Sequence, residues 1–234
     1  MTRLAVTGTG TEIGKTIVTA AIAAIAAADG RSVTVVKPAQ TGIAPGEESD
    51  VEVVRRLSGV TDVHELVRYD DPLAPASAAR RQGVTATPVP ALADRINGLP
   101  PTDLLIVEGA GGLLVRLDDD GRGLGDLAGL VNADVIVVTT AGLGSLNATA
   151  LTVEALRRRS LRCVGVVVGA WPAEPGLAEL CNLDDLPDYA GAPLLGAVPA
   201  GAGSTRADEF ARLARKSLAP ALGGTWSPAA RRTA

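Results

Sequence analysis

The sequence predicts an α/β fold: a single domain with a mainly parallel central sheet flanked by helices on both faces. Short runs of β-branched residues alternate with longer Ala- and Leu-rich stretches of helical period, the pattern of repeated strand–helix–strand units. The 234 residues suit one domain. The chain is 47% hydrophobic but only 2% aromatic, so Ala, Val, Leu and Ile must fill the core. Small aliphatic side chains are typical of helices packed on a parallel sheet.

The same alternation places the individual elements. Strands are expected at 3–7, 32–37, 103–108, 134–140, 162–168 and 194–198. Helices are expected at 15–28, 50–58, 88–97, 145–159 and 205–218, with shorter ones at 75–82 and 125–131. Residues 41–49, rich in Gly, Pro and Glu, predict a mobile loop. The domain is expected to end at residue 222 and to be followed by a frayed, flexible tail over 223–234.

Charge and cysteine content argue against several kinds of protein. A net charge of -4 and a pI of 5.1 provide no basic field for nucleic acid or for an anionic membrane surface. The chain opens on a strand-like segment and lacks an apolar run of about 18 residues, so we expect a cytoplasmic protein with a small soluble substrate. Cys163 and Cys181 have neither zinc-site nor disulfide-framework spacing and are expected to be free thiols.

A phosphate-binding loop follows the first expected strand. The run Gly8-Thr9-Gly10-Thr11-Glu12-Ile13-Gly14-Lys15-Thr16 is a Walker A element with one extra residue. Its glycines let backbone N–H groups turn toward a phosphate, and the helix beginning near Lys15 directs its positive end there. Lys15 would bridge the β- and γ-phosphates, and the Thr16 hydroxyl would bind Mg²⁺. A Gly-rich turn made for packing alone is the alternative, but the strand, helix and Lys-Thr pair favour phosphate binding.

A dinucleotide-binding loop is excluded by the register. A GxGxxG pattern beginning at Gly8 needs glycine at position 13, where this chain has Ile13.

The second expected strand ends in Lys37-Pro38-Ala39-Gln40-Thr41-Gly42, which adds an ammonium and a hydroxyl beside the phosphate loop. Lys37 is either a second phosphate-facing cation or an exposed lysine before a proline turn. Lysine is scarce here, with Lys15, Lys37 and Lys216 the only three, and this scarcity favours a function for Lys37.

Two acidic residues are candidate magnesium ligands. The third expected strand ends in Glu108 and continues as Gly109-Ala110-Gly111-Gly112, the form of a Walker B element. An acid at that position can bind Mg²⁺ directly or through water, while the alternative is an acid that caps the next turn. Asp50, at the end of the 41–49 loop, is either a metal ligand or a helix N-cap.

A second anion site is expected where a long helix opens at Gly142-Leu143-Gly144-Ser145-Leu146-Asn147, because the first N–H groups of a helix have no internal partner. Ser145 could instead only cap that helix. His64, the only histidine, lies in a polar, loop-like context and is expected at the surface.

The pieces Gly8–Thr16, Lys37–Gly42, Ser49–Asp50, Val107–Gly112 and Gly142–Asn147 together resemble, in order and spacing, the dethiobiotin synthetase family over residues 1–220. This resemblance implies a P-loop NTPase-like fold and a ligase of biotin biosynthesis. The implied substrates are 7,8-diaminononanoate, CO2 or bicarbonate and a nucleoside triphosphate, usually ATP, and the products are dethiobiotin, ADP and phosphate. An amine would capture CO2 as a carbamate, the carbamate would attack the γ-phosphate, and the second amine would close the ring.

The resemblance also implies roles for individual residues. Lys15, Lys37, Thr11 and Thr41 would be catalytic, and Thr16, Asp50 and Glu108 would bind Mg²⁺. The substrate site would comprise Lys37, Thr41, Gly111, Gly144, Ser145, Leu146 and Asn147, the last four from the neighbouring chain of a homodimer. The nucleotide site would comprise the whole run from Gly8 to Thr16, with Glu108, Gly109, Ala110, Gly111, Gly112, Gly169, Ala170, Trp171, Val198, Pro199, Ala200 and Gly201.

One departure from the family concerns the base. Many members carry an adenine-reading Asn after the fifth strand counted here, where this chain has Gly169-Ala170-Trp171. Base recognition would then rest on backbone groups near Ala170 and at 198–201, which predicts weak discrimination among nucleotides. We expect Lys15→Ala and Lys37→Ala to abolish turnover and to leave the fold intact, because both lysines are expected at a solvent-lined mouth.

Three other functions share parts of this pattern. A cobyrinic or cobyric acid amidase has a similar phosphate loop but needs a glutaminase domain with a nucleophilic Cys. A deviant-Walker switch or partitioning ATPase usually carries a signature Lys early in the loop, and Gly8 to Ile13 contains none. A non-catalytic nucleotide-binding module would bind nucleotide without turnover.

Overall fold

The computed structural model describes residues 1–44 and 46–229. The strands are β1 (Thr2–Gly8), β2 (Val33–Thr41), β3 (Val63–Tyr69), β4 (Leu104–Gly112), β5 (Asp134–Thr139), β6 (Cys163–Trp171) and β7 (Leu194–Pro199). The helices are α1 (Lys15–Ala28), α2 (Asp50–Ser58), α3 (Pro75–Arg81), α4 (Val89–Asn97), α5 (Leu124–Leu130), α6 (Ser145–Arg158), α7 (Leu177–Ala190) and α8 (Ala207–Ser217). Two short 3-10 turns, η1 (Ala202–Ser204) and η2 (Pro220–Leu222), flank α8.

The strands form one seven-stranded sheet in the order β3-β2-β4-β1-β5-β6-β7. Each neighbouring pair of strands runs parallel. The chain leaves β1 toward β2 on one side and later crosses from β4 to β5 on the other, so β1 ends at a switch point of the topology. Ligands of such sheets bind in the crevice beyond the carboxyl ends of the strands at that point. The loop after β1 therefore occupies the expected place for a ligand site.

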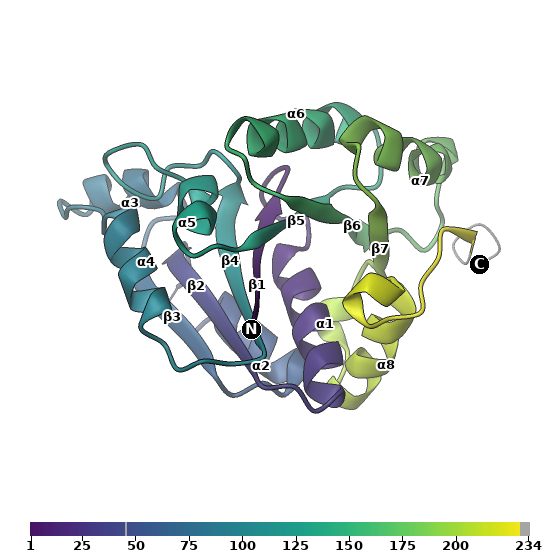
Figure 1. Ribbon diagram of the computed structural model, residues 1–234, viewed down its shortest axis with the longest axis horizontal. Helices are drawn as coiled ribbons and strands as arrows, with labels where there is room; N and C mark the ends of the chain where they lie inside the picture. Colours follow the sequence, from purple (N-terminus) through teal and green to yellow (C-terminus); the bar gives the residue numbers. More distant parts are fainter. Residues whose placement is uncertain (45, 230–234) are drawn as a thin grey trace.

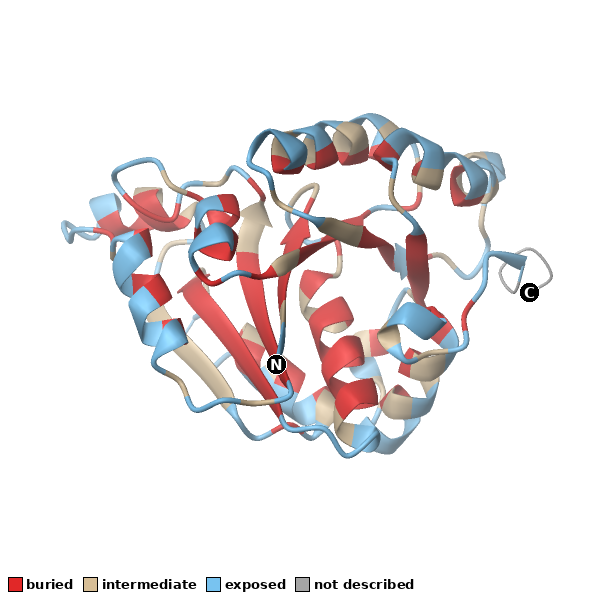
Figure 2. Cartoon of the chain, viewed as in Figure 1, coloured by how far each residue is buried: buried red, intermediate tan, exposed pale blue. Residues whose placement is uncertain are grey.

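Helices cover both faces of this sheet, as predicted (Figure 1). On one face α1 packs between α2 and α8, while α4 packs with α5, and α6 with α7, on the other. Figure 2 shows the strands of the middle of the sheet buried along most of their length and the helices buried only toward the sheet. Helix α1 is the exception, since it is buried from Val18 to Ala26. Its many alanines allow this close packing on the sheet and neighbouring helices, which fixes the phosphate loop at its start.

Strand β3 was not predicted. Its sequence carries charged residues, because it is the edge strand and pairs only with β2. Most of its residues are half-buried, so the alternation between apolar and polar positions is weak. The interpretation of His64 as a loop residue is wrong, since His64 lies in β3, with Nε2 2.7 Å from Oδ1 of Asp62.

Helix α7 was also missed. It contains Pro187, and proline inside a helical pattern argues against a helix. Its inner face nevertheless buries Asn182, Leu183 and Leu186. The cysteine prediction is confirmed, because Cys181 on this helix and Cys163 in β6 are both free thiols.

The start of the C-terminal segment packs against the domain, contrary to the expectation of a frayed tail from residue 223. Trp226 is 3% exposed, and its backbone N–H donates to the carbonyl of Leu218 at 2.9 Å. The N–H of Thr225 donates to the carbonyl of Arg215 at 2.7 Å. A single Trp buries roughly 150–250 Å², enough to order a few residues that otherwise have loop composition. Residues 230–234 of the expected tail lie outside the described residues.

Among the residues described, no helix has the length and apolar character needed to cross a membrane.

Candidate functional site

The phosphate loop, Gly8 to Thr16, connects β1 to α1. Its start is anchored to the neighbouring strand, because the N–H of Thr9 donates to the carbonyl of Val138 at 2.9 Å. Glu12 and Gly14 adopt left-handed conformations, with φ of 57° and 92°. Left-handed residues interspersed in a loop turn neighbouring N–H groups into one concavity, which binds anions. Gly14 is also required sterically, because a Cβ there would lie 2.4 Å from the carbonyl oxygen of Gly169.

Lys15 is the first residue of α1 and bends back into the loop. Its Nζ donates to the carbonyl of Gly10 at 2.8 Å, and the residue is 8% exposed. Burial lowers the pKa of Lys15, and the nearby charge of Lys37 lowers it further. An anion bound in the loop would raise the pKa of Lys15 again, because its negative charge would stabilise the charged ammonium. Lys15 therefore lies ready to pair with a phosphate.

Lys37 lies in the interior, between two carboxylates. Its Nζ donates to Oε1 of Glu108 at 2.9 Å and to the carbonyl of Gly109 at 3.1 Å, and it forms an ion pair with Asp50. Lys37 is 4% exposed and Glu108 1% exposed. Burial alone would lower the pKa of Lys37, but the charges of Glu108 and Asp50 outweigh burial and raise it. The expectation that both lysines sit at a solvent-lined mouth is therefore wrong, because strand β2 carries Lys37 inside.

Asp50 is the first residue of α2. The helix is capped by Ser49, whose N–H and hydroxyl bond the carboxylate of Glu52 at 2.7 and 2.8 Å. The alternative of Asp50 as the N-cap is therefore wrong. Its N–H instead donates to Oε1 of Gln40 at 3.2 Å, and its carboxylate turns toward Lys37. Burial tends to raise the pKa of Asp50, but Lys37 outweighs it and lowers the pKa.

Thr16 completes an oxygen-rich group around Lys37. Its hydroxyl donates to Oε1 of Glu108 at 2.9 Å, which leaves the lone pairs of the hydroxyl oxygen free for a cation. Hydroxyl and carboxylate oxygens are the ligands that Mg²⁺ prefers. No group of three or more His, Cys, Asp or Glu side chains suited to a metal occurs in the described part of the chain. Mg²⁺ does not need one, since it is usually bound by one or two carboxylates together with substrate phosphates.

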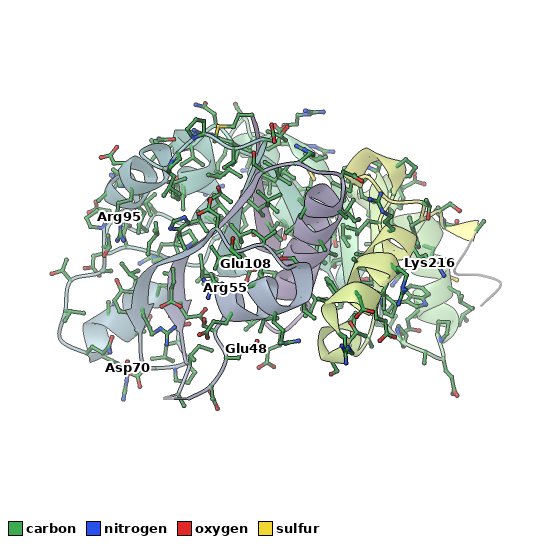
Figure 3. The ribbon with its side chains drawn as sticks, turned by 90° about the horizontal axis from the view of Figure 1, so that it is seen from below. Glu48, Arg55, Asp70, Arg95, Glu108 and Lys216 are labelled. Atoms are coloured by element: carbon green, nitrogen blue, oxygen red, sulfur yellow. The ribbon has the colours of Figure 1, made fainter. Side chains whose placement is uncertain are left out.

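These residues line a cavity of about 750 Å³. It collects most of the predicted phosphate, metal and substrate residues of this chain: Thr11, Glu12, Ile13, Gly14, Lys15, Thr16, Lys37, Thr41, Asp50, Glu108, Ala110 and Gly111. Figure 3 shows Glu108 in the middle of the molecule and Lys216, the remaining lysine, on α8 near its edge. Lys216 takes no part in this site.

The cavity also has lining residues that sequence reasoning missed. Gln40 comes from the end of β2, and an apolar wall is formed by Ile43, Pro72, Leu73, Ala74, Pro75 and Val115. The run from Pro72 to Pro75 precedes α3 and carries no charged or hydrogen-bonding side chain, so no motif marks it. The one sequence signal for this wall is a proline-flanked apolar turn directly after a strand. That signal depends on β3, which the sequence does not predict.

The predicted second anion site lies outside this cavity, at the start of α6. Gly144 is the N-cap, with a left-handed φ of 88°. The alternative of Ser145 as the cap is therefore wrong. Ser145 is 1% exposed and its hydroxyl accepts a hydrogen bond from Asn182 at 3.1 Å. The side chain of Ser145 is thus turned inward, whereas Asn147 is exposed and Leu146 half-buried.

The two predicted base-recognition segments lie together, beside the phosphate loop but not in the cavity. Trp171 pairs with Pro199 across β6 and β7, and the N–H of Ala200 donates to the carbonyl of Trp171 at 2.7 Å. Gly169 packs on the loop so closely that a Cβ there would lie 2.0 Å from the carbonyl oxygen of Ile13. Trp171 is buried and Ala170 exposed.

Fold and loop define a P-loop nucleotide-binding protein. A family model described as an AAA domain matches residues 2–207. The septum site-determining protein MinD of Pyrococcus horikoshii, solved with Mg-ADP, is similar in structure with a TM-score of 0.57 and 17% identity, covering 92% of this chain and 94% of that one. A ParA family ATPase of Chlorobium tepidum aligns with a TM-score of 0.53 and 14% identity over 91% and 88% of the chains. At such identities the likeness concerns the fold alone.

Sequence comparison gives the particular family. The ATP-dependent dethiobiotin synthetase BioD of Frankia casuarinae is 61% identical over 227 residues, covering 97% of this chain and 95% of the relative. The synthetase of the same name from Streptomyces coelicolor is 55% identical over 224 residues, covering 95% and 94%. The chain belongs to the ATP-dependent dethiobiotin synthetase family, whose members are ATP-dependent ligases.

Proposed function

We propose that this chain carboxylates 7,8-diaminononanoate with CO2 and closes the product to the cyclic urea dethiobiotin, while ATP is converted to ADP and phosphate. The observation that carries the proposal is the convergence of two buried lysines on one cavity. Lys15 comes from the phosphate loop and Lys37 from the end of β2, and both line the cavity together with Thr16, Asp50 and Glu108. The second ammonium comes from β2, whereas a switch ATPase carries its extra lysine within the phosphate loop, where Gly8 to Ile13 contains none.

The chemistry proceeds through anions that these lysines can neutralise. One amine of the substrate attacks CO2, loses a proton and becomes a carbamate. A carbamate oxygen then attacks the γ-phosphate and ADP leaves. The second amine attacks the carbonyl carbon of the mixed anhydride and displaces phosphate, and loss of its proton completes the ring. Because each stage concentrates negative charge, catalysis consists of positioning and electrostatic stabilisation, with Lys15 on the phosphates and Lys37 on the carbamate.

Mg²⁺ fits the oxygen donors of Thr16, Asp50 and Glu108, which lie around Lys37. When bound there with the nucleotide, the ion would neutralise charge on the β- and γ-phosphates. The carboxylates now paired with Lys37 would then be shared with the cation. Lys37 would be freed to turn its ammonium to the carbamate while Thr11 and Thr41 line the remaining space. The apolar wall of Pro72 to Pro75 suits the methylene chain of the diamino acid.

The substrate carboxylate is proposed to bind the start of α6, at Gly144 to Asn147, in a neighbouring subunit of a homodimer. Leu143, beside that helix start, is 91% exposed, and Leu114 and Leu151 are also exposed. A contiguous exposed apolar patch is typical of an interface, and we propose that these three side chains belong to one. The dimer is tested by measuring the molar mass of the protein in solution by light scattering.

The nucleotide base is proposed to contact backbone groups near Ala170 and at 198–201. A cytoplasmic location stays a prediction of the sequence.

The test is phosphate release by the purified chain, with and without diaminononanoate and bicarbonate. The proposed function predicts release only with both, in one-to-one ratio with dethiobiotin. Release that needs neither compound would identify a switch ATPase. Binding of ATP with no release under any condition would identify a non-catalytic module, and dependence on glutamine would identify an amidase.

A further inference from the structure

The loop that opens α6, residues 141–145, depends on one buried side chain from another helix. Asn182 of α7 is 5% exposed. Its Nδ2 donates to the carbonyl of Ala141 at 2.7 Å and lies 3.1 Å from both the carbonyl of Gly142 and the hydroxyl of Ser145. One side-chain amide thus contacts three acceptors across this loop. Neither the active-site cavity nor any motif of the sequence includes Asn182.

The chemistry of this contact requires an amide nitrogen. The three acceptors offer lone pairs, so the two N–H bonds of Nδ2 can serve them if one N–H is shared between two acceptors, whereas an oxygen in the same place would face two carbonyl oxygens. Within the loop itself the turn is closed only by the N–H of Ser145, which donates to the carbonyl of Gly142 at 3.3 Å. Without Asn182 the buried carbonyl of Ala141 would lose its partner, and buried acceptors are costly to leave unpaired. The loop would then rearrange.

We infer that Asn182 is a positioning residue, which fixes the loop 141–145 and thereby aims the first N–H groups of α6 at the carboxylate of the diamino acid. This inference rests on the proposed function, which places that carboxylate at Gly144 to Asn147. Asn182 itself touches no substrate atom. Its effect passes through the left-handed turn at Gly144 and the inward-turned hydroxyl of Ser145.

The experiment compares the full-length protein with Asn182→Leu and Asn182→Asp, which have nearly the same size but lack both N–H donors. Asn182→Ser serves if Asn182→Leu does not fold. Leu186→Ala is the matched control, because Leu186 is a fully buried residue of the same helix. For each variant, KM and kcat are measured with diaminononanoate, with ATP and with octane-2,3-diamine, which is the same substrate without its carboxylate. Hydrogen exchange of residues 141–147 is followed without substrate.

For Asn182→Leu we expect the KM for diaminononanoate to rise about ten- to a hundredfold, since a misplacement of 1 Å has effects of that order. The KM for ATP should stay within about twofold and the penalty should vanish with octane-2,3-diamine. Exchange at 141–147 should accelerate, whereas Leu186→Ala should lower only the Tm. An equal penalty with octane-2,3-diamine, or unchanged exchange at 141–147, would overturn the inference. If the unaltered protein makes no dethiobiotin, the proposed function fails, and exchange still decides whether Asn182 fixes the loop.

Discussion

The Nζ of Lys37 lies 2.9 Å from Oε1 of Glu108, and both residues are almost completely buried. Asp50 pairs with the same ammonium from the other side. The cation that should meet the carbamate is therefore kept charged and in place, before any ligand binds, by the two carboxylates proposed to bind Mg²⁺. Under the proposed function, metal binding and release of Lys37 would therefore be linked.

Lys37→Met should abolish turnover and also destabilise the protein, contrary to what the sequence alone suggests. The substitution leaves Glu108 buried without its cation, and breaking a buried ion pair by removing one partner costs about 3–5 kcal/mol. The free energy of unfolding in urea measures this. The double variant Lys37→Met/Glu108→Gln should regain most of the stability and none of the activity. A Lys37→Met protein as stable as the unaltered chain would show that the ion pair contributes little.

The pairing of Asp50 should be visible in the acid dependence of stability. Because its pKa is lowered in the folded protein, chiefly by Lys37 acting against burial, the charged carboxylate stabilises the fold above its unfolded pKa of about 3.9. That contribution is lost as the pH falls through the folded pKa. The difference in unfolding free energy between the unaltered protein and Asp50→Asn should be constant from pH 7 to about pH 4 and should shrink below it. A difference independent of pH down to the acid transition would contradict the pairing.

Lys15 should become the free amine, and so begin to react with acylating reagents, at a lower pH than an ordinary lysine. Burial and Lys37 lower its pKa, so more of it is the free amine at mildly alkaline pH than for an ordinary lysine, whose pKa is about 10.4. Mass spectrometry after brief acetic anhydride treatment separates the three lysines. Lys15 should react with a midpoint pH below that of N-acetyl-lysine amide and should be protected by ATP with Mg²⁺. Protection of Lys216 but not of Lys15 would place the nucleotide elsewhere.

Discrimination among nucleotides should be weak. The segment where an amide side chain would read adenine is Gly169-Ala170-Trp171, and Trp171 is buried while Ala170 offers only backbone groups. We expect kcat/KM for ATP, CTP, GTP and UTP to agree within about tenfold, because discrimination by a site is large only where its buried polar groups pair with one substrate alone. A preference for ATP of a thousandfold or so would require a base-reading group not identified at this site.

Local sequence signals were sufficient to predict those parts of the fold and of the site that one short segment determines by itself. The phosphate loop and Glu108 could be predicted because β1, α1 and β4 are strongly apolar, and both helices that open on the site, α1 and α2, have the predicted bounds. Edge strand β3 could not be predicted, because the weak alternation of a half-buried strand resembles the composition of a polar loop. The burial of Lys37 and its pairing with Asp50 depend on how β2, β4 and α2 come together. The role of Asn182 could not be predicted for the same reason, because the chain segments that it joins are some forty residues apart.

The central claim, that a carbamate formed from CO2 attacks the γ-phosphate, is tested most directly by oxygen labelling. The protein is mixed with diaminononanoate, ATP and C18O2 in unlabelled water, and the phosphate is analysed by mass spectrometry before the CO2 exchanges with solvent. The account predicts one labelled oxygen transferred from CO2 to each phosphate and a second retained in the carbonyl of dethiobiotin. Phosphate that carries only solvent oxygen would show that water attacks the nucleotide, and the proposed mechanism would be wrong.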